Sequence, residues 1–475
     1  MSKRLIGRKA EIEILQEAYN SDKSEFVAVY GRRRVGKTFL IKELFSASYT
    51  FYFTGIANVG AARQRANFSA YLSRFFPEGA DENVPNDWFA AFQLLIKYLE
   101  KSDAKKKIIF IDELPWLDTS RSDFIPALDN FWNGWATHRD DVLLIACGSA
   151  TSWMINSLIN NTGGLHNRVT KRIHLQPFTL QEVELFLQHK GSDFERYEIV
   201  QLYMALGGIP FYLEAINVQK SIPQNIDHLF FSENGLLRTE FQNLFRSLFY
   251  KHERHVAVIE ALAQKAKGLT RKELATVTKL TNGGRFTKIL NELEQCGFIK
   301  KYQPFGKKQK GSLYQLIDQY SLFFLKFVRD SKAVGEGVWL AKFEQPTYRS
   351  WSGYAFENVC LYHIKNIKKH LGIGSVYTEI SAWRSQQTAK GAQIDLVLDR
   401  RDRVINLCEI KFSENEFSIQ KAYAENLKNK VAAFKQETKT KKACFLTFLT
   451  TFGLKTNKYS RQLVKNELTM DALFD

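Results

Sequence analysis

Short apolar runs and amphipathic stretches alternate along the chain. Residues 26–30 (FVAVY) and 108–111 (IIFI) are apolar runs of the length and composition typical of buried parallel strands, and the first is followed at once by a helical pattern. From about residue 245 the pattern changes to short amphipathic helices and a hairpin, and near residue 391 it changes again to alternating strands. We therefore expect an α/β protein of several domains.

A glycine-rich segment lies between the first apolar run and its helix. The segment reads GRRRVGKT and follows the GxxxxGK[ST] pattern in the strand, loop, helix order that a phosphate-binding loop requires. Backbone N–H groups of such a loop surround phosphates at a helix N-terminus, the lysine reaches the β- and γ-phosphates, and the hydroxyl is a Mg²⁺ ligand. The residues expected to bind ATP and Mg²⁺ here are Gly31, Arg32, Arg33, Arg34, Val35, Gly36, Lys37 and Thr38.

A second strand supplies the acids that a P-loop hydrolase needs. The run at 108–111 ends in Asp112 and Glu113. We expect Asp112 to hold Mg²⁺, and Glu113 to orient or deprotonate the attacking water. Acids at strand ends are common, but the loop upstream favours the catalytic interpretation over that alternative.

Two further residues are candidates for contact with the γ-phosphate. The apolar run VLLIACGSATSWM passes through Ser149, whose small polar side chain would lie beside the Asp112 strand. Arg168 precedes a basic strand and could act as a γ-phosphate sensor or finger, within its own subunit or on a neighbour in a homo-oligomer. A surface salt bridge is an equally good interpretation of Arg168.

Taken in order, the motifs LIGRKAEIEIL, GRRRVGKT, FIDELPWL, CGSATSWM, NRVTKRIHLQPF and LGGIPFYL resemble those of archaeal-type ATPases, a STAND-related branch of the AAA+-like P-loop proteins. The resemblance covers about the first half of the chain. It implies an ATPase core followed by a helical lid, with Arg8 near the nucleotide base and the turn at Pro210 facing the nucleotide. From the residues alone, the glycines before Pro210 indicate only the end of a helix.

The middle of the chain has the pattern of a winged helix-turn-helix. Thr270 and Glu273 have capping-box spacing, and the helix at 283–294 has one apolar face that leaves Arg285 and Lys288 outside. A hairpin with a lysine-rich turn at 307–310 follows. Such a unit could lay its third helix in a DNA groove, with the turn contacting phosphates. Alternatively, it only joins domains or binds protein.

Near the end of the chain, a predicted hairpin carries acids and a lysine. Its first strand contains Asp395, and its second contains Glu409 and Lys411, which share one face because strand side chains alternate. A preceding helix offers Glu357 as a third acid. Acids so placed could bind Mg²⁺ or Mn²⁺ and activate water, with Lys411 stabilising charge on a phosphate. A surface ion pair is the alternative for Lys411.

This segment resembles the PD-(D/E)xK nuclease superfamily, which has the restriction-endonuclease-like fold. The resemblance implies that Glu357, Asp395 and Glu409 bind the metal and that Lys411 completes the site. The chain has Ile394 where the superfamily has the proline that gives it its name. The motif is also compatible with a folded but inactive domain.

The composition predicts the kind of partner and the cellular compartment of the protein. Lys and Arg number 67 against 50 Asp and Glu, which gives a net charge of +17 and favours nucleic acid, DNA in particular, as a partner. The cysteines at 147, 296, 360, 408 and 444 form no CxxC pair and indicate buried thiols in a reducing compartment. No apolar stretch approaches the roughly 18 residues that a membrane span needs, so we expect a cytoplasmic protein without membrane contact.

The sequence thus predicts four domains in order: a P-loop ATPase core with a parallel sheet at 1–175, a helical lid at 176–244, a winged helix-turn-helix at 245–330 and a restriction-endonuclease-like α/β domain at 345–475. The leading hypothesis is an ATPase coupled to DNA binding and to a Mg²⁺-dependent nuclease. The alternative is a nucleotide-dependent switch or scaffold whose last domain binds nucleic acid or protein without cutting.

Overall fold

The computed structural model describes residues 5–77, 83–249, 251–265, 268–306, 311–343, 345–385 and 392–475. The chain divides into two compact units, Met1–Pro177 and Phe178–Asp475. The lysine-rich turn expected at 307–310 lies outside the described residues.

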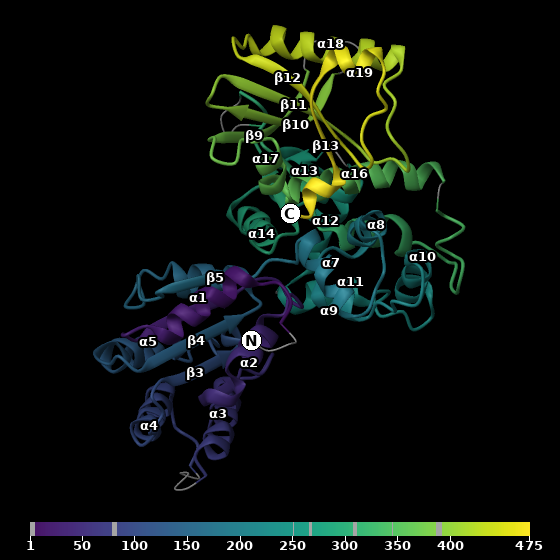
Figure 1. The fold of residues 1–475 in the computed structure, drawn as a ribbon. Coiled ribbons are helices and arrows are strands. Elements are labelled where there is room, and N and C mark those ends of the chain that lie inside the picture. The colour runs from purple at the N-terminus through teal and green to yellow at the C-terminus, as the bar shows by residue number, and fades with distance from the viewer. Residues whose placement is uncertain are drawn as a thin grey trace. The chain divides into compact units, whose positions relative to one another are not determined.

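The first unit is built on a parallel sheet. Its strands are β1 (Glu25–Tyr30), β2 (Tyr49–Thr54), β3 (Lys107–Asp112), β4 (Val142–Gly148) and β5 (Lys171–His174). Its helices are α1 (Lys9–Asn20), α2 (Lys37–Phe45), α3 (Ala61–Phe75), α4 (Trp88–Glu100), α5 (Phe124–Gly134) and α6 (Thr151–Trp153) (Figure 1). The strand order is β2-β3-β4-β1-β5, and all four neighbouring pairs are parallel.

The central strands of this sheet are apolar because helices cover them. β3 and β4 are buried at every position and β1 at all but its last, as expected for parallel strands. Large aromatic side chains fill the space between the strands and helices α3, α4 and α5, among them Phe53, Phe68, Trp88, Phe92 and Phe131. This packing fixes the carboxyl ends of β1 and β3, where the loop and the acids lie.

The second unit begins with helices and ends with a mixed sheet (Figure 1). Its helices are α7 (Leu180–His189), α8 (Arg196–Leu206), α9 (Pro210–Glu214), α10 (Ile222–Ile226), α11 (Glu240–Leu248), α12 (Glu253–Ala263), α13 (Arg271–Thr278), α14 (Gly284–Gln295), α15 (Gln319–Phe323), α16 (Pro346–Tyr362), α17 (Ile364–His370), α18 (Lys421–Thr438) and α19 (Lys458–Leu463). Its strands are β6 (Leu269–Thr270), β7 (Ile299–Tyr302), β8 (Leu313–Leu316), β9 (Thr378–Arg384), β10 (Gln393–Arg400), β11 (Val404–Lys411), β12 (Ala443–Thr450) and β13 (Val464–Thr469).

Three parts of the second unit correspond to stretches that the sequence separates. Helices α7 to α11 form the helical lid, and α7 starts with a capping box of Thr179 and Glu182. The segment from α12 to β8, which we call the helix–hairpin module (residues 253–316), contains a sheet of order β6-β8-β7. The C-terminal sheet has the order β13-β12-β11-β10-β9, with β9, β10 and β11 antiparallel and β11, β12 and β13 parallel.

These parts pack into one unit through specific contacts. Leu180 N–H, at the start of α7, donates to His363 Nε2 at 2.9 Å. Phe305, after β7, donates its N–H to Ala382 O at 3.1 Å and packs its ring on Phe434 of α18. The lid, the helix–hairpin module and the C-terminal sheet are therefore a single compact body.

Within the described ranges, no helix combines the length and the apolar character that crossing a lipid bilayer would require.

Candidate functional site

The loop between β1 and α2 has the backbone of a phosphate cradle. Gly31, Arg34 and Gly36 have positive φ angles of 146°, 70° and 90°. A Cβ on Gly31 would lie 2.3 Å from the carbonyl oxygen of Leu175, so only glycine fits there. Gly36 precedes α2 and has no side chain to cap it, which leaves the N–H groups of the first turn available to phosphate oxygens.

Lys37 is held over this loop. Its Nζ donates to the carbonyl oxygens of Gly31 and Arg32, both at 3.0 Å, and to Ser149 Oγ at 3.1 Å. The lysine is 5% exposed. A buried ammonium group that touches only neutral oxygens can gain a charged partner when a phosphate enters the loop. Arg32 is buried beside it, whereas Arg33 is exposed.

Thr38 of α2 and Asp112 of β3 place two side-chain oxygen atoms next to each other. Thr38 Oγ1 donates to Asp112 Oδ2 at 2.8 Å, and Asp112 is 4% exposed. A hydroxyl and a carboxylate are the oxygen ligands that Mg²⁺ prefers, so these residues fit the expected ion. When bound, Mg²⁺ would neutralise charge on the nucleotide phosphates.

Glu113 follows β3 with a left-handed backbone, at φ 48°. Its N–H donates to Asp112 Oδ1 at 2.9 Å, and its Oε1 accepts the Ser149 hydroxyl at 2.9 Å. Ser149, at the end of β4, thus connects Lys37 to Glu113. Backbone strain at a non-glycine residue is typical of functional positions. This arrangement can hold a carboxylate close to the phosphate cradle, where a water molecule could be activated.

Two titratable groups near the cradle respond to its charges. Burial raises the pKa of Cys147 well above its usual value; the Asp112 carboxylate raises it further, while Lys37 opposes the rise. Burial lowers the pKa of His174, and Lys37 lowers it further. The His174 ring stacks on Tyr30 at 4.8 Å between centroids.

The remaining residues predicted for this site lie in different places. Arg8 is 6% exposed and donates from Nη2 to Val35 O at 3.1 Å, so it supports the loop backbone. Arg168 is exposed on the turn before β5. Pro210 is the first residue of α9 in the second unit. Contacts of Arg8 with the base, of Arg168 with the γ-phosphate and of Pro210 with the nucleotide stay predictions.

The C-terminal hairpin pairs as the sequence predicts. β10 and β11 are antiparallel with Leu396 opposite Cys408, and Asp395 and Glu409 are the next residues after this pair on their strands. Burial raises the pKa of Tyr423 on α18, and the carboxylates of Glu409 and Asp395 raise it further. The two acids therefore act on the same phenol.

Glu409 is surrounded by donors. It is 1% exposed. Lys430 Nζ contacts Oε1 at 2.6 Å, Tyr423 OH donates to Oε2 at 2.9 Å, and Lys411 Nζ lies 3.8 Å from Oε2. Gln393 Nε2 donates to the other acid, Asp395, at 3.2 Å. The carboxylate of Glu409 is satisfied by the protein itself.

The expected three-carboxylate metal set of Glu357, Asp395 and Glu409 is not formed in the structure. Across the described ranges, no group of three or more His, Cys, Asp or Glu side chains is placed to hold a metal ion. Glu357 lies on α16, where it adds to the effect of burial in raising the pKa of Cys360. The physical reason is that Lys430 and Tyr423 occupy both oxygens of Glu409, so these residues do not fit a divalent ion as they stand.

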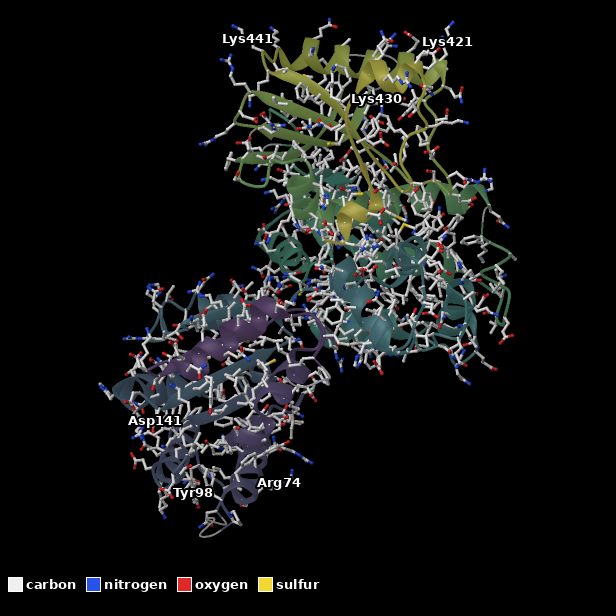
Figure 2. All side chains as sticks on the ribbon, viewed as in Figure 1. Arg74, Tyr98, Asp141, Lys421, Lys430 and Lys441 are labelled. Carbon is white, nitrogen blue, oxygen red and sulfur yellow. The ribbon has the colours of Figure 1, made fainter. Side chains whose placement is uncertain are left out.

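Sequence reasoning missed the partners of Glu409. The lysines of the helix at 421–438 look alike in sequence. A signal was present, because Tyr423 and Lys430 are seven residues apart and so lie on one face of a helix, with the buried Leu427 between them. Figure 2 shows Lys430 on the side of α18 that faces the sheet. Lys421 lies at the end of α18 where the helix begins.

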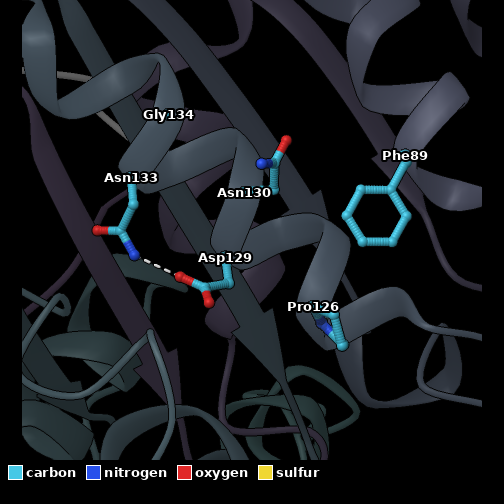
Figure 3. Close-up of a pocket in the computed structure, with 6 residues that line it drawn as sticks. All are labelled: Phe89, Pro126, Asp129, Asn130, Asn133 and Gly134. Atoms are coloured by element: carbon cyan, nitrogen blue, oxygen red, sulfur yellow. Dashed lines mark hydrogen bonds between the residues drawn. The ribbon is translucent and has the colours of Figure 1, made fainter.

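A separate hollow lies on the surface of the first unit between α4 and α5 (Figure 3). It is lined by Phe89, Pro126, Asp129, Asn130, Asn133 and Gly134. Asn133 donates to the Asp129 carboxylate within it. The hollow contains none of the residues predicted for the nucleotide site.

Similarity to known proteins agrees with the geometry of the first unit. Residues 5–216 match the family described as an ATPase domain predominantly from Archaea. An uncharacterized protein of Methanocaldococcus jannaschii is 24% identical over 426 residues, which cover 88% of this chain and 90% of that protein. An uncharacterized ATP-binding protein of the same organism is 50% identical over 38 residues, 8% of this chain and 64% of that protein.

The solved structure of a Walker-type ATPase from Pyrococcus abyssi covers 68% of this chain and 97% of its own, with 18% identity and a TM-score of 0.49. The assignment rests on the family match together with the cradle, its lysine and its paired hydroxyl and carboxylate. The part of the chain at residues 5–216 is accordingly a Walker-type P-loop ATPase domain.

Proposed function

We propose that this protein is an ATP-hydrolysing switch that binds DNA through its second unit. The single observation that carries the proposal is the solvent-facing side of α14, which presents Arg285, Lys288 and Asn291 at helical spacing. The opposite side of the helix is buried through Phe286, Ile289, Leu290 and Leu293. A basic, solvent-facing third helix is what a winged helix uses to enter the major groove.

The surroundings of α14 support this role. Arg271 donates from Nε to Asn282 Oδ1 at 2.7 Å and from Nη2 to Gly283 O at 3.1 Å, which fixes the turn before α14. His255 of α12 contacts Glu292 of α14 at 2.8 Å. A helix positioned on both sides in this way can present its outer face without reordering, which lowers the cost of binding.

Charge favours a polyanionic partner. The net charge of the chain is +17, and Lys288 on α14 is 76% exposed. Phosphate contacts supply most of the affinity of sequence-independent binding. The base of the hairpin is fixed to the C-terminal sheet through Phe305, so the helix–hairpin module would carry the C-terminal sheet with it onto DNA.

At the nucleotide site, we propose that Glu113 orients and deprotonates the water that attacks the γ-phosphate. Ser149 would hold Glu113 in the absence of nucleotide, because its hydroxyl already donates to that carboxylate. Lys37 would move from the loop carbonyls to the phosphates. Loss of these contacts on nucleotide binding is the change that the switch would transmit.

The test is the affinity for a fluorescent DNA duplex, measured by anisotropy over a range of salt concentrations. Removing two phosphate-contacting charges with Arg285→Ala/Lys288→Ala should weaken binding and reduce the slope of log affinity against log salt by about 1.8. The matched control, Arg74→Ala/Lys101→Ala, removes the same charge from the first unit and should leave the slope unchanged. An equal loss in both double variants would contradict the role of α14.

Cleavage of nucleic acid is the second candidate. It is favoured by Asp395 and Glu409, which both act on the Tyr423 phenol, with Lys411 two residues beyond Glu409 on the same strand. The element order α16, α17, β9, β10, β11, α18, β12 supports this candidate. Incubation with DNA or RNA and Mn²⁺ distinguishes the candidates: products that disappear in Asp395→Ala would favour the nuclease, and intact substrate would favour the switch.

A further inference from the structure

The buried carboxylate of Glu409 already has a cation. Lys430 approaches from α18 and contacts Oε1 at 2.6 Å, while Tyr423 of the same helix donates to Oε2 at 2.9 Å. Glu409 is 1% exposed and Lys430 is mostly buried, with 19% of its side chain exposed. A hydrogen-bonded ion pair in such a place is strong and is little screened by solvent.

Among the described residues, two lysines lie beside the carboxylate of Glu409. Asp395 and Glu409 supply two carboxylates that both act on the Tyr423 phenol, and Lys411 and Lys430 supply two ammonium groups. Lys411 Nζ lies 3.8 Å from Glu409 Oε2 and Lys430 contacts the other oxygen. Two neighbouring carboxylates without such cations would repel each other and would attract a divalent ion.

Other lysines of α18 do not have this environment. Lys428 pairs with Glu425 on the helix surface, and the two side chains are 42% and 56% exposed. An exposed pair of this kind contributes little and is screened by salt. The environment of Lys430 therefore differs from that of Lys428. The Nζ of Lys430 lies at hydrogen-bonding distance from Glu409.

We propose that Lys430 is the internal counter-cation of Glu409 and that it keeps divalent metal ions off the pair formed by Asp395 and Glu409. In this account the ammonium group takes the place that a metal ion would need, and the C-terminal sheet is metal-free while Lys430 is in place. The inference goes beyond the proposed DNA binding and does not depend on it, since it rests only on contacts among β10, β11 and α18.

The experiment measures Mn²⁺ binding to the nucleotide-free full-length chain by the electron paramagnetic resonance signal of free Mn²⁺. All proteins in the experiment carry Asp112→Asn, so that the Asp112 carboxylate of the ATP site does not contribute to Mn²⁺ binding. The arms are this background, Lys430→Met, Lys430→Gln, the matched control Lys428→Met, and Lys430→Met/Glu409→Gln. Circular dichroism checks the fold of each, and Lys430→Gln reports the same effect if Lys430→Met does not fold.

We expect Lys430→Met and Lys430→Gln each to bind one additional Mn²⁺ per chain, at least about tenfold more tightly than the background. Lys428→Met should bind like the background, and Lys430→Met/Glu409→Gln should lose the additional ion. Three results would overturn the proposal: a background that already binds Mn²⁺ as tightly as Lys430→Met, no gain in either Lys430 variant, or an additional ion that persists without Glu409.

Discussion

At the scale of single residues, the nucleotide site depends on a chain of contacts from Lys37 through Ser149 to Glu113. Ser149 Oγ accepts from Lys37 Nζ at 3.1 Å and donates to Glu113 Oε1 at 2.9 Å. One hydroxyl thus holds both the phosphate-binding cation and the proposed base. The two functions of the site, binding and hydrolysis, should therefore be separable by substitution.

Glu113→Gln should retain ATP binding and lower the turnover of ATP by roughly 10²–10⁴-fold, because the amide cannot accept the proton of the attacking water. Steady-state phosphate release measures turnover, and equilibrium binding of labelled ATP measures affinity. Asp118→Asn is the matched control, since Asp118 is exposed and accepts from Trp153 Nε1, a bond that the amide oxygen can keep. Unchanged turnover in Glu113→Gln would assign the base elsewhere.

His363 makes the second unit sensitive to acid. Its Nε2 accepts from Leu180 N–H at 2.9 Å and its Nδ1 donates to Val359 O at 2.8 Å, which requires the neutral ring. Burial lowers the pKa of His363 from 6.5 to about 4, against the opposing effect of the bond to Val359. The ring packs edge-on against Tyr203 and Tyr362.

Because the folded state disfavours the protonated ring, His363 contributes stability above pH 6.5 that is lost as the pH falls from 6.5 towards about 4. The loss should be on the order of 3 kcal/mol. Urea unfolding at a series of pH values measures it. In His363→Gln this component should be missing, while the exposed-residue control His138→Gln should follow the wild type; parallel curves for wild type and His363→Gln would disprove the assignment.

At the scale of elements, the turn between α8 and α9 has a structural reason for its glycines. Gly207 ends α8 with φ 66°. A Cβ on Gly208 would lie 1.9 Å from the carbonyl oxygen of Phe178. The backbone N–H of Phe178 donates to the carbonyl oxygen of Gly208 at 2.6 Å. Tyr203 OH donates to the same Phe178 oxygen at 2.8 Å. The turn therefore holds the first residue of the second unit.

Gly208→Ala should destabilise the second unit by more than about 2 kcal/mol, because backbone atoms on both sides must move to admit the methyl group. Gly284→Ala is the control, since a Cβ there would meet open space and alanine favours a helix more than glycine does. Hydrogen exchange of the amides in α7 and α8 reports the change locally. Equal protection in Gly208→Ala and the wild type would refute the close approach.

Much of this element structure could be predicted from the sequence, because its causes are local. The phosphate loop, the capping boxes at Thr179 and Thr270, and the antiparallel pairing of β10 with β11 follow from spacing over a few residues. The contact between Lys430 and Glu409 joins positions 21 residues apart on different elements. The spacing from Tyr423 indicates the helix face on which Lys430 lies, but no local pattern indicates Glu409 as its partner, so the contact could not be predicted.

At the scale of the whole molecule, the two units carry different candidate sites. The first contains most of the segment at residues 5–216 that matches the ATPase domain family. The second, in which the sequence predicts three domains, is one compact body because His363, Phe305 and their partners join its parts. Long-range contacts of this kind are not visible as a pattern along the chain. An input at the lid could thus reach α14 and the C-terminal sheet together.

The central claim is that the nucleotide bound at the ATP site, ATP or ADP, controls the affinity of the protein for DNA. The most direct measurement is the affinity of the Glu113→Gln chain for a fluorescent duplex, determined by anisotropy in saturating ATP and in saturating ADP. The account predicts that the two dissociation constants differ by at least about fivefold, and that Arg285→Ala/Lys288→Ala removes binding in the tighter state. Equal dissociation constants in ATP and ADP would contradict it, because the ATPase would then have no influence on the DNA-binding unit.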